Sequence, residues 1–196
     1  MKNAKEGWII LLLILCSIYM SLTPMPEAFA KAAFNDRTVI LLSESFTNDT
    51  FPPPGWAAYD NDASDVEWIR DTDQYSTAPA SASHFWDVDN FLDGWLVTPR
   101  ILIPSDDCWL NFNQSGDDVF ENYAYHGIMA STGYSDPSIG DFYEVMEPPL
   151  PPEGAWTMTP IRVNLGAFVG EEVNLAFRYS GWHGDKWWID DVEIIC

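Results

Sequence analysis

The fold class is decided by the closing stretch of the chain, Trp187-Trp188-Ile189-Asp190-Asp191-Val192-Glu193-Ile194-Ile195. Aromatic and β-branched side chains at this density are typical of a β-strand. Ten further apolar or alternating runs precede it, at Val39–Phe46, Trp56–Tyr59, Val66–Arg70, Ala82–Trp86, Trp95–Ile103, Trp109–Asn113, Tyr125–Ser131, Phe142–Met146, Ile161–Leu165 and Val173–Tyr179.

Turn-forming residues separate these runs, as in Pro52-Pro53-Pro54-Gly55 and Ser115-Gly116-Asp117-Asp118. No stretch keeps a helical 3.6-residue period over 11 residues. Many short strands with Gly, Pro and Asp in the gaps indicate an antiparallel sandwich or barrel. The sequence therefore predicts an all-β protein.

The charge balance restricts the partners of the chain. The 196 residues include 9 Lys plus Arg against 30 Asp plus Glu, a formal net charge of −21. This charge repels phosphate groups, so nucleic acids and anionic lipids are excluded as default partners. Hydrophobic residues make up 47% and aromatic residues 15%, which is too apolar for a disordered acidic chain. We therefore expect a packed, acidic domain.

The amino terminus has the pattern of a secretory signal. Lys2 and Lys5 precede an apolar run over 8–22, and Ala28-Phe29-Ala30 supplies a small-x-small cleavage site. This order predicts a signal peptide over 1–30, cleaved after Ala30. The alternative is a retained membrane anchor, because the run approaches the ~20 residues that a spanning helix needs. After cleavage we expect no stable membrane insertion and a secreted or cell-surface location.

The rest of the chain is expected to form one domain. Residues 31–42 would be a leader and the start of the first strand, and residues 43–196 the domain itself. Two cysteines remain in this part, Cys108 and Cys196. In an exported protein they permit one intramolecular disulfide, and the alternative is a pair of free thiols.

Two acidic residues interrupt the apolar pattern of the strands. Alternation along the first predicted strand places Glu44 on the face of three large apolar side chains, Ile40, Leu42 and Phe46. In the last strand it places Asp190 on the face of Trp188, Val192 and Ile194. An ionised carboxylate taken out of water without a partner costs several kcal/mol. Both acids therefore need a compensating group.

A calcium ion is one candidate for that group. Nine Lys plus Arg, less Lys2 and Lys5, leave seven in the exported part of the chain, so cationic partners are few. Oxygen ligands from flexible loops suit calcium, and Asp60 and Asp62 could supply more of them. The acidic turn lacks the spacing of an EF-hand loop. The alternative, which the sequence leaves open, is that the acids are hydrogen-bonded to Arg and backbone amides.

Several motifs, in this order along the chain, resemble a known family. They are Glu44-Ser45-Phe46, Phe51–Trp56, Tyr59-Asp60-Asn61-Asp62, Trp68, Trp95-Leu96-Val97-Thr98-Pro99, Met129-Ala130-Ser131-Thr132-Gly133, Asn164–Tyr179 and Trp188–Ile194. Together they resemble the cleaved-adhesin domain, also called the choice-of-anchor J domain, over roughly 43–195. The acidic turn lacks the glycines usual in the family, which weakens the case for Asp60 and Asp62.

The resemblance implies an antiparallel jelly-roll β-sandwich, a MAM-like module of the kind found in the haemagglutinin–adhesin regions of gingipains. It also implies a structural calcium where the first and last strands meet. This ion would be held by Glu44 and Asp190, with Asp60 or Asp62 as further ligands.

An aromatic turn before the last strand is the candidate ligand-binding segment. Within it, aromatic faces beside polar groups suit a sugar ring or a protein partner. The predicted ligand-binding residues are Trp182, His183, Asp185 and Trp187, and a second candidate group is Tyr123, Tyr125 and His126. The alternative is that these rings fill the core.

The sequence contains no pattern that requires catalysis. It has no Gly-x-Ser-x-Gly elbow, and a glycosidase needs two carboxylates at a defined separation that sequence does not establish. We therefore expect a secreted, non-catalytic, adhesin-type module that binds extracellular glycan or protein and is stabilised by calcium. The main alternative is a purely structural module of a cell-surface assembly, and a further one is a glycoside hydrolase or peptidase-associated activity.

Overall fold

The computed structural model describes residues 38–116, 125–149, 157–182 and 184–196. These residues form twelve β-strands and one 3₁₀ turn, η2 (Gly166–Phe168). The strands are β1 (Ile40–Glu44), β2 (Ala57–Asp60), β3 (Ile69–Asp71), β4 (Ser81–His84), β5 (Leu92–Val97), β6 (Ile101–Leu102), β7 (Trp109–Gly116), β8 (Tyr125–Ser131), β9 (Tyr143–Met146), β10 (Thr159–Asn164), β11 (Glu172–Gly181) and β12 (Trp187–Ile195).

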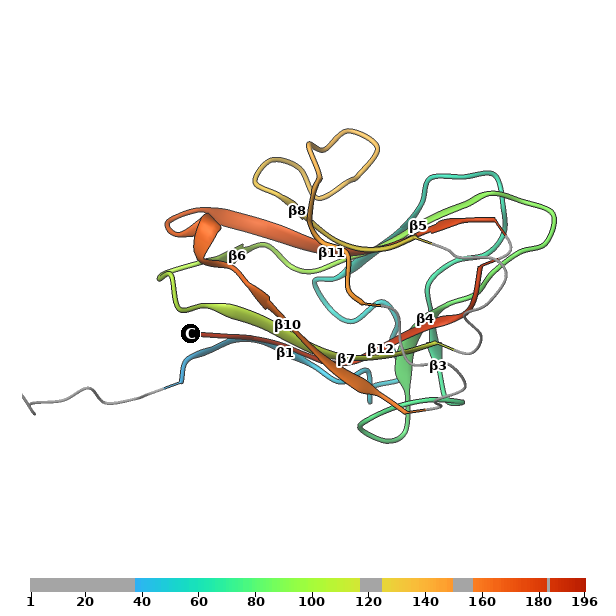
Figure 1. The fold of residues 1–196 in the computed structure, drawn as a ribbon, viewed down its shortest axis with the longest axis horizontal. Coiled ribbons are helices and arrows are strands. Elements are labelled where there is room, and N and C mark those ends of the chain that lie inside the picture. Colours follow the sequence, from blue (N-terminus) through green and yellow to red (C-terminus); the bar gives the residue numbers. More distant parts are fainter. Residues whose placement is uncertain (1–37, 117–124, 150–156, 183) are drawn as a thin grey trace, which may run out of the picture. The chain divides into compact units, whose positions relative to one another are not determined.

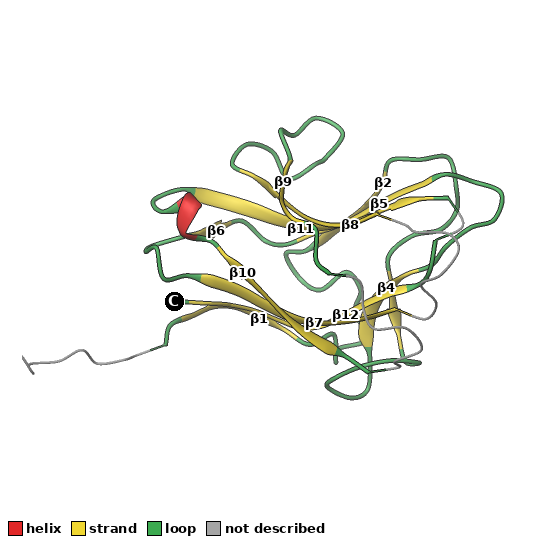
Figure 2. Ribbon diagram, in the orientation of Figure 1, coloured by secondary structure: helices red, strands yellow, loops and turns green. Residues whose placement is uncertain are grey.

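The strands make two six-stranded antiparallel sheets that face each other (Figures 1 and 2). The first sheet has the order β10-β7-β12-β4-β3, with β1 also paired to β12. The second has the order β2-β5-β11-β8-β9, with β6 also paired to β11. Neighbouring strands are mostly distant in sequence, so the chain crosses repeatedly between sheets. The predicted all-β, antiparallel jelly-roll β-sandwich is confirmed.

The strand boundaries follow the predicted runs, with one split. The run Trp95–Ile103 divides into β5 and β6, because Pro99 has no N–H to donate to a ladder. Thr98 bridges the gap, since its Oγ1 accepts from the Leu175 N–H at 3.0 Å and its carbonyl accepts from Asn174 Nδ2 at 2.9 Å. Both halves of the run therefore stay attached to β11.

Aromatic rings fill much of the space between the sheets. Phe177 on β11 contacts Phe112 across the sandwich, with ring centroids 5.1 Å apart. It also packs against Trp56 and Trp187, at 6.5 Å and 6.0 Å. Each such ring removes 150–250 Å² from water, so this cluster is a main source of stability.

A β-bulge in β12 changes which side chains face the core. The register with β7 shifts between Asp190 and Glu193, and Asp191 has a φ of 50°. A bulge adds one residue to the strand, so the alternation changes phase there. The core therefore contains Trp187 and Ile189 before the bulge and Val192 and Ile194 after it. Our prediction that Trp188 and Asp190 share the face of Val192 and Ile194 was wrong for this reason.

A second irregularity lies in β1. Its register with β12 shifts between Ile40 and Leu42, and the Ile40 side chain is exposed. The predicted apolar face of Ile40, Leu42, Glu44 and Phe46 is therefore not continuous. Phe46, beyond the end of the strand, is fully buried with a φ of 50°. Glu44 itself is half-buried.

A disulfide joins Cys108 to Cys196. The two residues flank a cross-strand pair, because Trp109 of β7 lies opposite Ile195 of β12. The bond thus ties the carboxyl end of β12 to the start of β7.

Candidate functional site

Asp190, a predicted calcium ligand, is completely buried and surrounded by backbone donors. Its Oδ2 accepts from the N–H groups of Ser76 and Thr77, both at 2.8 Å, and its Oδ1 accepts from the Asp191 N–H at 2.8 Å. Burial raises the pKa of this carboxyl to about 6, against the opposing effect of the three N–H donors. The geometry matches the backbone-amide alternative that the sequence left open.

Glu44, the other predicted ligand on this sheet, lies opposite Val192 of β12. Its Oε1 accepts from the Phe46 N–H at 2.6 Å. Arg70 lies close to this turn, because its guanidinium donates to the carbonyl oxygens of Phe46, at 2.9 Å, and Thr47, at 3.2 Å. Glu44 and Asp190 thus lie on paired strands of one sheet.

Asp60 and Asp62 lie at the end of β2, in the other sheet. They stabilise a turn, since Asp60 Oδ1 accepts from the Asp62 N–H at 3.0 Å and Asp62 Oδ1 from the Ser64 N–H at 2.7 Å. Asp62 Oδ2 also accepts from the Asp93 N–H at 2.5 Å. Each carboxylate oxygen carries a second lone pair, so these bonds do not exhaust the acceptors. Across the described ranges, however, no three Asp, Glu, His or Cys side chains are grouped so as to hold a metal ion.

The predicted ligand turn divides into an exposed and a buried part. Trp182 is 55% exposed, and its ring contacts that of Phe91 at 6.2 Å. Trp187 is fully buried, stacks on His126 at 4.6 Å and donates from Nε1 to Gln114 Oε1 at 3.0 Å. Our placement of Trp187 at a ligand surface is corrected, because its ring lies in the core.

The other residues predicted for this surface also differ in position. Asp185 is only 5% exposed, and its carbonyl accepts from the Tyr179 hydroxyl at 2.8 Å, so it too lies inside. His183 and Tyr123 lie outside the described residues. In the second candidate group, His126 is buried, whereas Tyr125 is half-buried on β8.

The sequence did not point to the loop that joins β4 to β5. There Phe85, Trp86, Val88 and Phe91 have exposed fractions of 37–46%. We call these four side chains together with Trp182, which contacts Phe91, the end surface. The β4–β5 loop lies at the opposite end of the sandwich from the carboxyl terminus (Figure 2). The strand predicted over Ala82–Trp86 ends at His84, so the loop begins two residues earlier than the sequence indicated. Asp87, Asp89 and Asn90 are turn-forming residues that could have indicated this loop in the sequence. In the structure Asp87 stabilises the turn by accepting from the Asp89 N–H and from Asn90 Nδ2.

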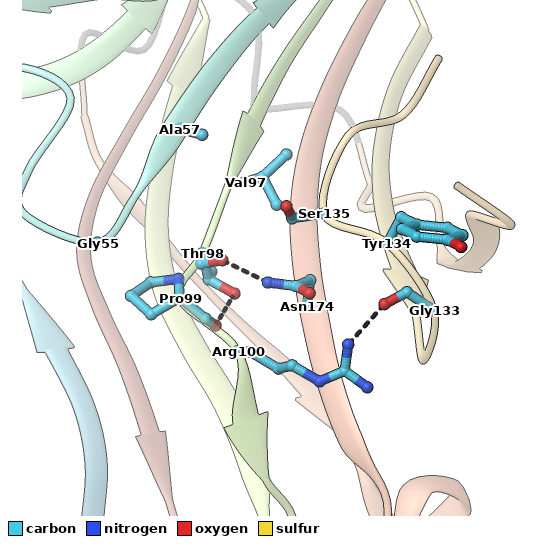
Figure 3. Close-up of a pocket in the computed structure, with 10 residues that line it drawn as sticks. All are labelled: Gly55, Ala57, Val97, Thr98, Pro99, Arg100, Gly133, Tyr134, Ser135 and Asn174. Atoms are coloured by element: carbon cyan, nitrogen blue, oxygen red, sulfur yellow. Dashed lines mark hydrogen bonds between the residues drawn. The ribbon is translucent and has the colours of Figure 1, made fainter. Parts of the chain in front are cut away.

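A pocket of about 400 Å³ opens against the second sheet (Figure 3). Ala57 of β2, Val97 of β5 and Asn174 of β11 contribute to its lining, and Tyr134 of the β8–β9 loop stands at its side. Arg100 connects this loop to the sheet by donating to Gly133 O at 2.5 Å and to Thr132 O at 2.7 Å. We call this the sheet-face pocket.

These features define the class of the protein as a β-sandwich with exposed aromatic and polar surfaces of the kind used for binding. The family model of the Cleaved Adhesin Domain matches residues 39–163, and the chain belongs to this family. The earlier resemblance is thereby confirmed. Among the residues described, we find no helix of the length and apolarity that a membrane span requires.

Known relatives and structures agree with this assignment. The chain is 26% identical over 188 aligned residues to hemagglutinin A of Porphyromonas gingivalis, a match that covers 84% of this chain and 9% of that protein. It therefore spans less than a tenth of that relative's length. The K3 cleaved adhesin domain of Lys-gingipain from Porphyromonas gingivalis W83 matches with a TM-score of 0.62 and 21% identity, over 81% of this chain and 99% of that one.

A second solved structure shares the fold at lower identity. It is a CBM61 module in complex with β-1,4-galactotriose, with a TM-score of 0.53 and 13% identity over 77% of this chain and 93% of that one. At this identity the likeness concerns the fold alone.

Proposed function

We propose that the domain is a non-catalytic, adhesin-type module that binds an extracellular glycan or protein. The observation that carries the proposal is the end surface, where five large apolar side chains are exposed on two adjoining loops. Exposed aromatic groups rimmed by polar residues are the usual signature of a binding site. The family membership and the galactotriose complex of the CBM61 module support the same class of function.

The acidic charge of the chain restricts which classes of ligand can bind at this surface. Asp87 and Asp89 alternate with the exposed side chains of the β4–β5 loop, and the whole chain carries −21. Such a field repels anionic ligands and attracts cationic ones. A neutral sugar or a basic protein segment is the chemistry that fits. We further propose that the domain acts outside the cell; the predicted signal over 1–30 lies outside the described residues.

We expect Trp182→Ala to reduce ligand capture while leaving the thermal midpoint nearly unchanged. The ring is 55% exposed, so its removal costs little packing, whereas a buried aromatic at a binding surface contributes about 2 kcal/mol or more. Binding to a glycan array and to immobilised matrix proteins, with melting curves on the same samples, measures both effects. Tyr143→Ala is the matched control, because Tyr143 is similarly exposed on β9. A large loss of stability in the Trp182 variant would assign the ring to packing instead.

Calcium stabilisation stays a prediction, and we propose Glu44 and Asp190, with backbone carbonyls, as the ligands. Removing a ligand that binds only the folded state lowers stability by RT ln(1 + [Ca]/Kd), about 2.7 kcal/mol at a hundredfold excess over Kd. Chelator should therefore lower the thermal midpoint of the protein, and Glu44→Gln should abolish this response. An identical melting curve with and without chelator would count against calcium and in favour of the hydrogen bonds described above.

The binding screen also decides between the proposal and its main alternative. A saturable ligand supports the binding module. Repeated absence of binding across glycans and matrix proteins would instead favour a purely structural module within a larger surface assembly.

A further inference from the structure

The outer face of the second sheet, which points away from the core, carries an ordered row of side chains. The strand registers place Tyr59 opposite Trp95, Trp95 opposite Arg178, and Arg178 opposite Gly127. Directly opposed residues point to the same side of a sheet. The adjacent residues in these strands, such as Leu96, Phe177 and Ile128, belong to the core, so the row lies on the outer face.

Arg178 is held rigidly in the middle of this row. Its guanidinium carbon lies 4.8 Å from the centre of the Trp95 ring and 5.7 Å from that of Tyr125. Its Nε donates to Asp93 Oδ1 at 2.7 Å, and the same oxygen accepts from Trp95 Nε1 at 3.1 Å. Within the described part of the chain, the two terminal amino groups of Arg178 have no hydrogen-bond partner, and the side chain is 30% exposed. These two amino groups are hydrogen-bond donors that the proposal below assigns to a ligand.

Tyr125 provides a second aromatic ring beside Arg178, and its partner Glu144 provides a hydrogen-bond acceptor. A Cβ at position 127 would lie 2.2 Å from the Tyr125 hydroxyl, so glycine is required there for the ring to lie along the sheet. The hydroxyl donates to Glu144 Oε2 at 2.5 Å. Burial and the Glu144 carboxylate raise the pKa of this phenol, which stays neutral. Glu144 is itself exposed and retains acceptor capacity.

The next row of the same face leads to the sheet-face pocket. Ala57, Val97 and Ala176 lie in register there. Val97 and Ala176 are buried beside Trp95, on whose ring Phe142 packs at 5.3 Å, whereas Ala57 is half-buried and lines the pocket together with Val97. The face thus offers two half-buried tyrosine rings, Tyr59 and Tyr125, a fixed fork of donors, and carboxylate acceptors, beside a pocket of about 400 Å³.

We propose that this face is a second binding site, separate from the end surface, that takes a neutral oligosaccharide of pyranose rings. The C–H face of a pyranose would stack on the half-buried ring of Tyr59 or Tyr125. The sugar hydroxyls would accept from Arg178 and donate to Asp93 or Glu144. An acidic sugar does not fit, because Asp93 already neutralises Arg178 and the chain carries −21. The inference rests on the proposed function in its glycan form and assigns it a site and a ligand class.

The test is calorimetric titration of the purified protein with the neutral oligosaccharides that bind on a glycan array, and with trigalacturonate as the acidic arm. Arg178→Gln should weaken neutral-sugar binding roughly tenfold, since it removes a hydrogen bond and a ring contact. Arg162→Gln is the matched control, because Arg162 lies 4.1 Å from the Trp109 ring on the first sheet. Gly127→Ala is a second test, which displaces the Tyr125 ring while keeping every polar group.

The site is supported if both variants lose neutral-sugar affinity with unchanged thermal midpoints, while Arg162→Gln does not. Wild-type affinity in Arg178→Gln, or preference for trigalacturonate, overturns it. If the wild type binds a matrix protein but no neutral oligosaccharide, this inference fails while the proposed function stands. If it binds neither glycan nor protein, both fail.

Discussion

Replacing both cysteines with alanine, as Cys108→Ala with Cys196→Ala, is expected to lower the free energy of unfolding by about 2–5 kcal/mol. The disulfide closes a loop with a sequence separation of 88 residues, so it restricts a large part of the unfolded chain. It also restrains the edge at which β12 meets β7, and the last strand pairs with three others, β1, β4 and β7.

Guanidinium denaturation of the wild type with and without reductant, beside the double variant, measures this effect. Reduction keeps both sulfur atoms in place, so the reduced wild type separates loss of the cross-link from loss of packing at Cys108, which is fully buried. We expect most of the destabilisation to be present already on reduction. Equal midpoints for the oxidised protein and for protein with verified free thiols would refute the assignment.

The strand content could be predicted from the sequence because each run is short, apolar and bounded by turn residues. The register shifts in β1 and β12 could not be predicted. Whether a strand alternates without interruption depends on its partner's register, and Asp190 to Glu193 shift against β7 in a way that no local pattern of β12 specifies. One extra residue there moved Trp188 and Asp190 to the other face.

For the candidate sites, too, the sequence indicated the segment but not which of its side chains are exposed. Trp182 and Trp187 are five residues apart in one aromatic turn, yet one is exposed and the other is in the core. Only tertiary contacts, such as the stacking of Trp187 on His126, distinguish them. The outer-face row was likewise hidden, because Tyr59, Trp95, Arg178 and Tyr125 come from four strands that the topology brings together.

Lowering the pH from 7 to 4 is expected to destabilise the domain by several kcal/mol, chiefly through two buried histidines. Burial lowers the pKa of His84 to about 4 and that of His126 to about 3. Nδ1 of His84 lies 2.8 Å from the Phe85 carbonyl, and Nε2 has no partner among the described residues. Protonating Nε2 would therefore place a charge in the core without an acceptor.

The direction follows from the proton uptake of the unfolded chain. A histidine in the unfolded chain has a pKa near 6.5. As the pH falls from 6.5 to about 4, the unfolded state therefore binds a proton at His84 while the folded state does not, and this difference favours unfolding. Stability from this source is complete above pH 6.5 and is lost below it, at about 1.36 kcal/mol per unit of pKa shift, or about 3 kcal/mol for His84. Asp190 opposes this loss, because its pKa is raised to about 6 and the folded state takes up that proton first.

The comparison of wild type with His84→Gln isolates the histidine contribution. Urea titrations at pH 7 and pH 4, with chelator throughout so that acid release of a metal adds nothing, give the change in unfolding free energy of each protein. The variant should lose about 3 kcal/mol less than the wild type over this interval, whatever its stability at pH 7. Equal losses in the two proteins would mean that His84 is protonated in the folded state, which requires an acceptor at Nε2. Because His84 Nε2 lies against Gly94 of β5, such an acceptor would have to enter between the sheets.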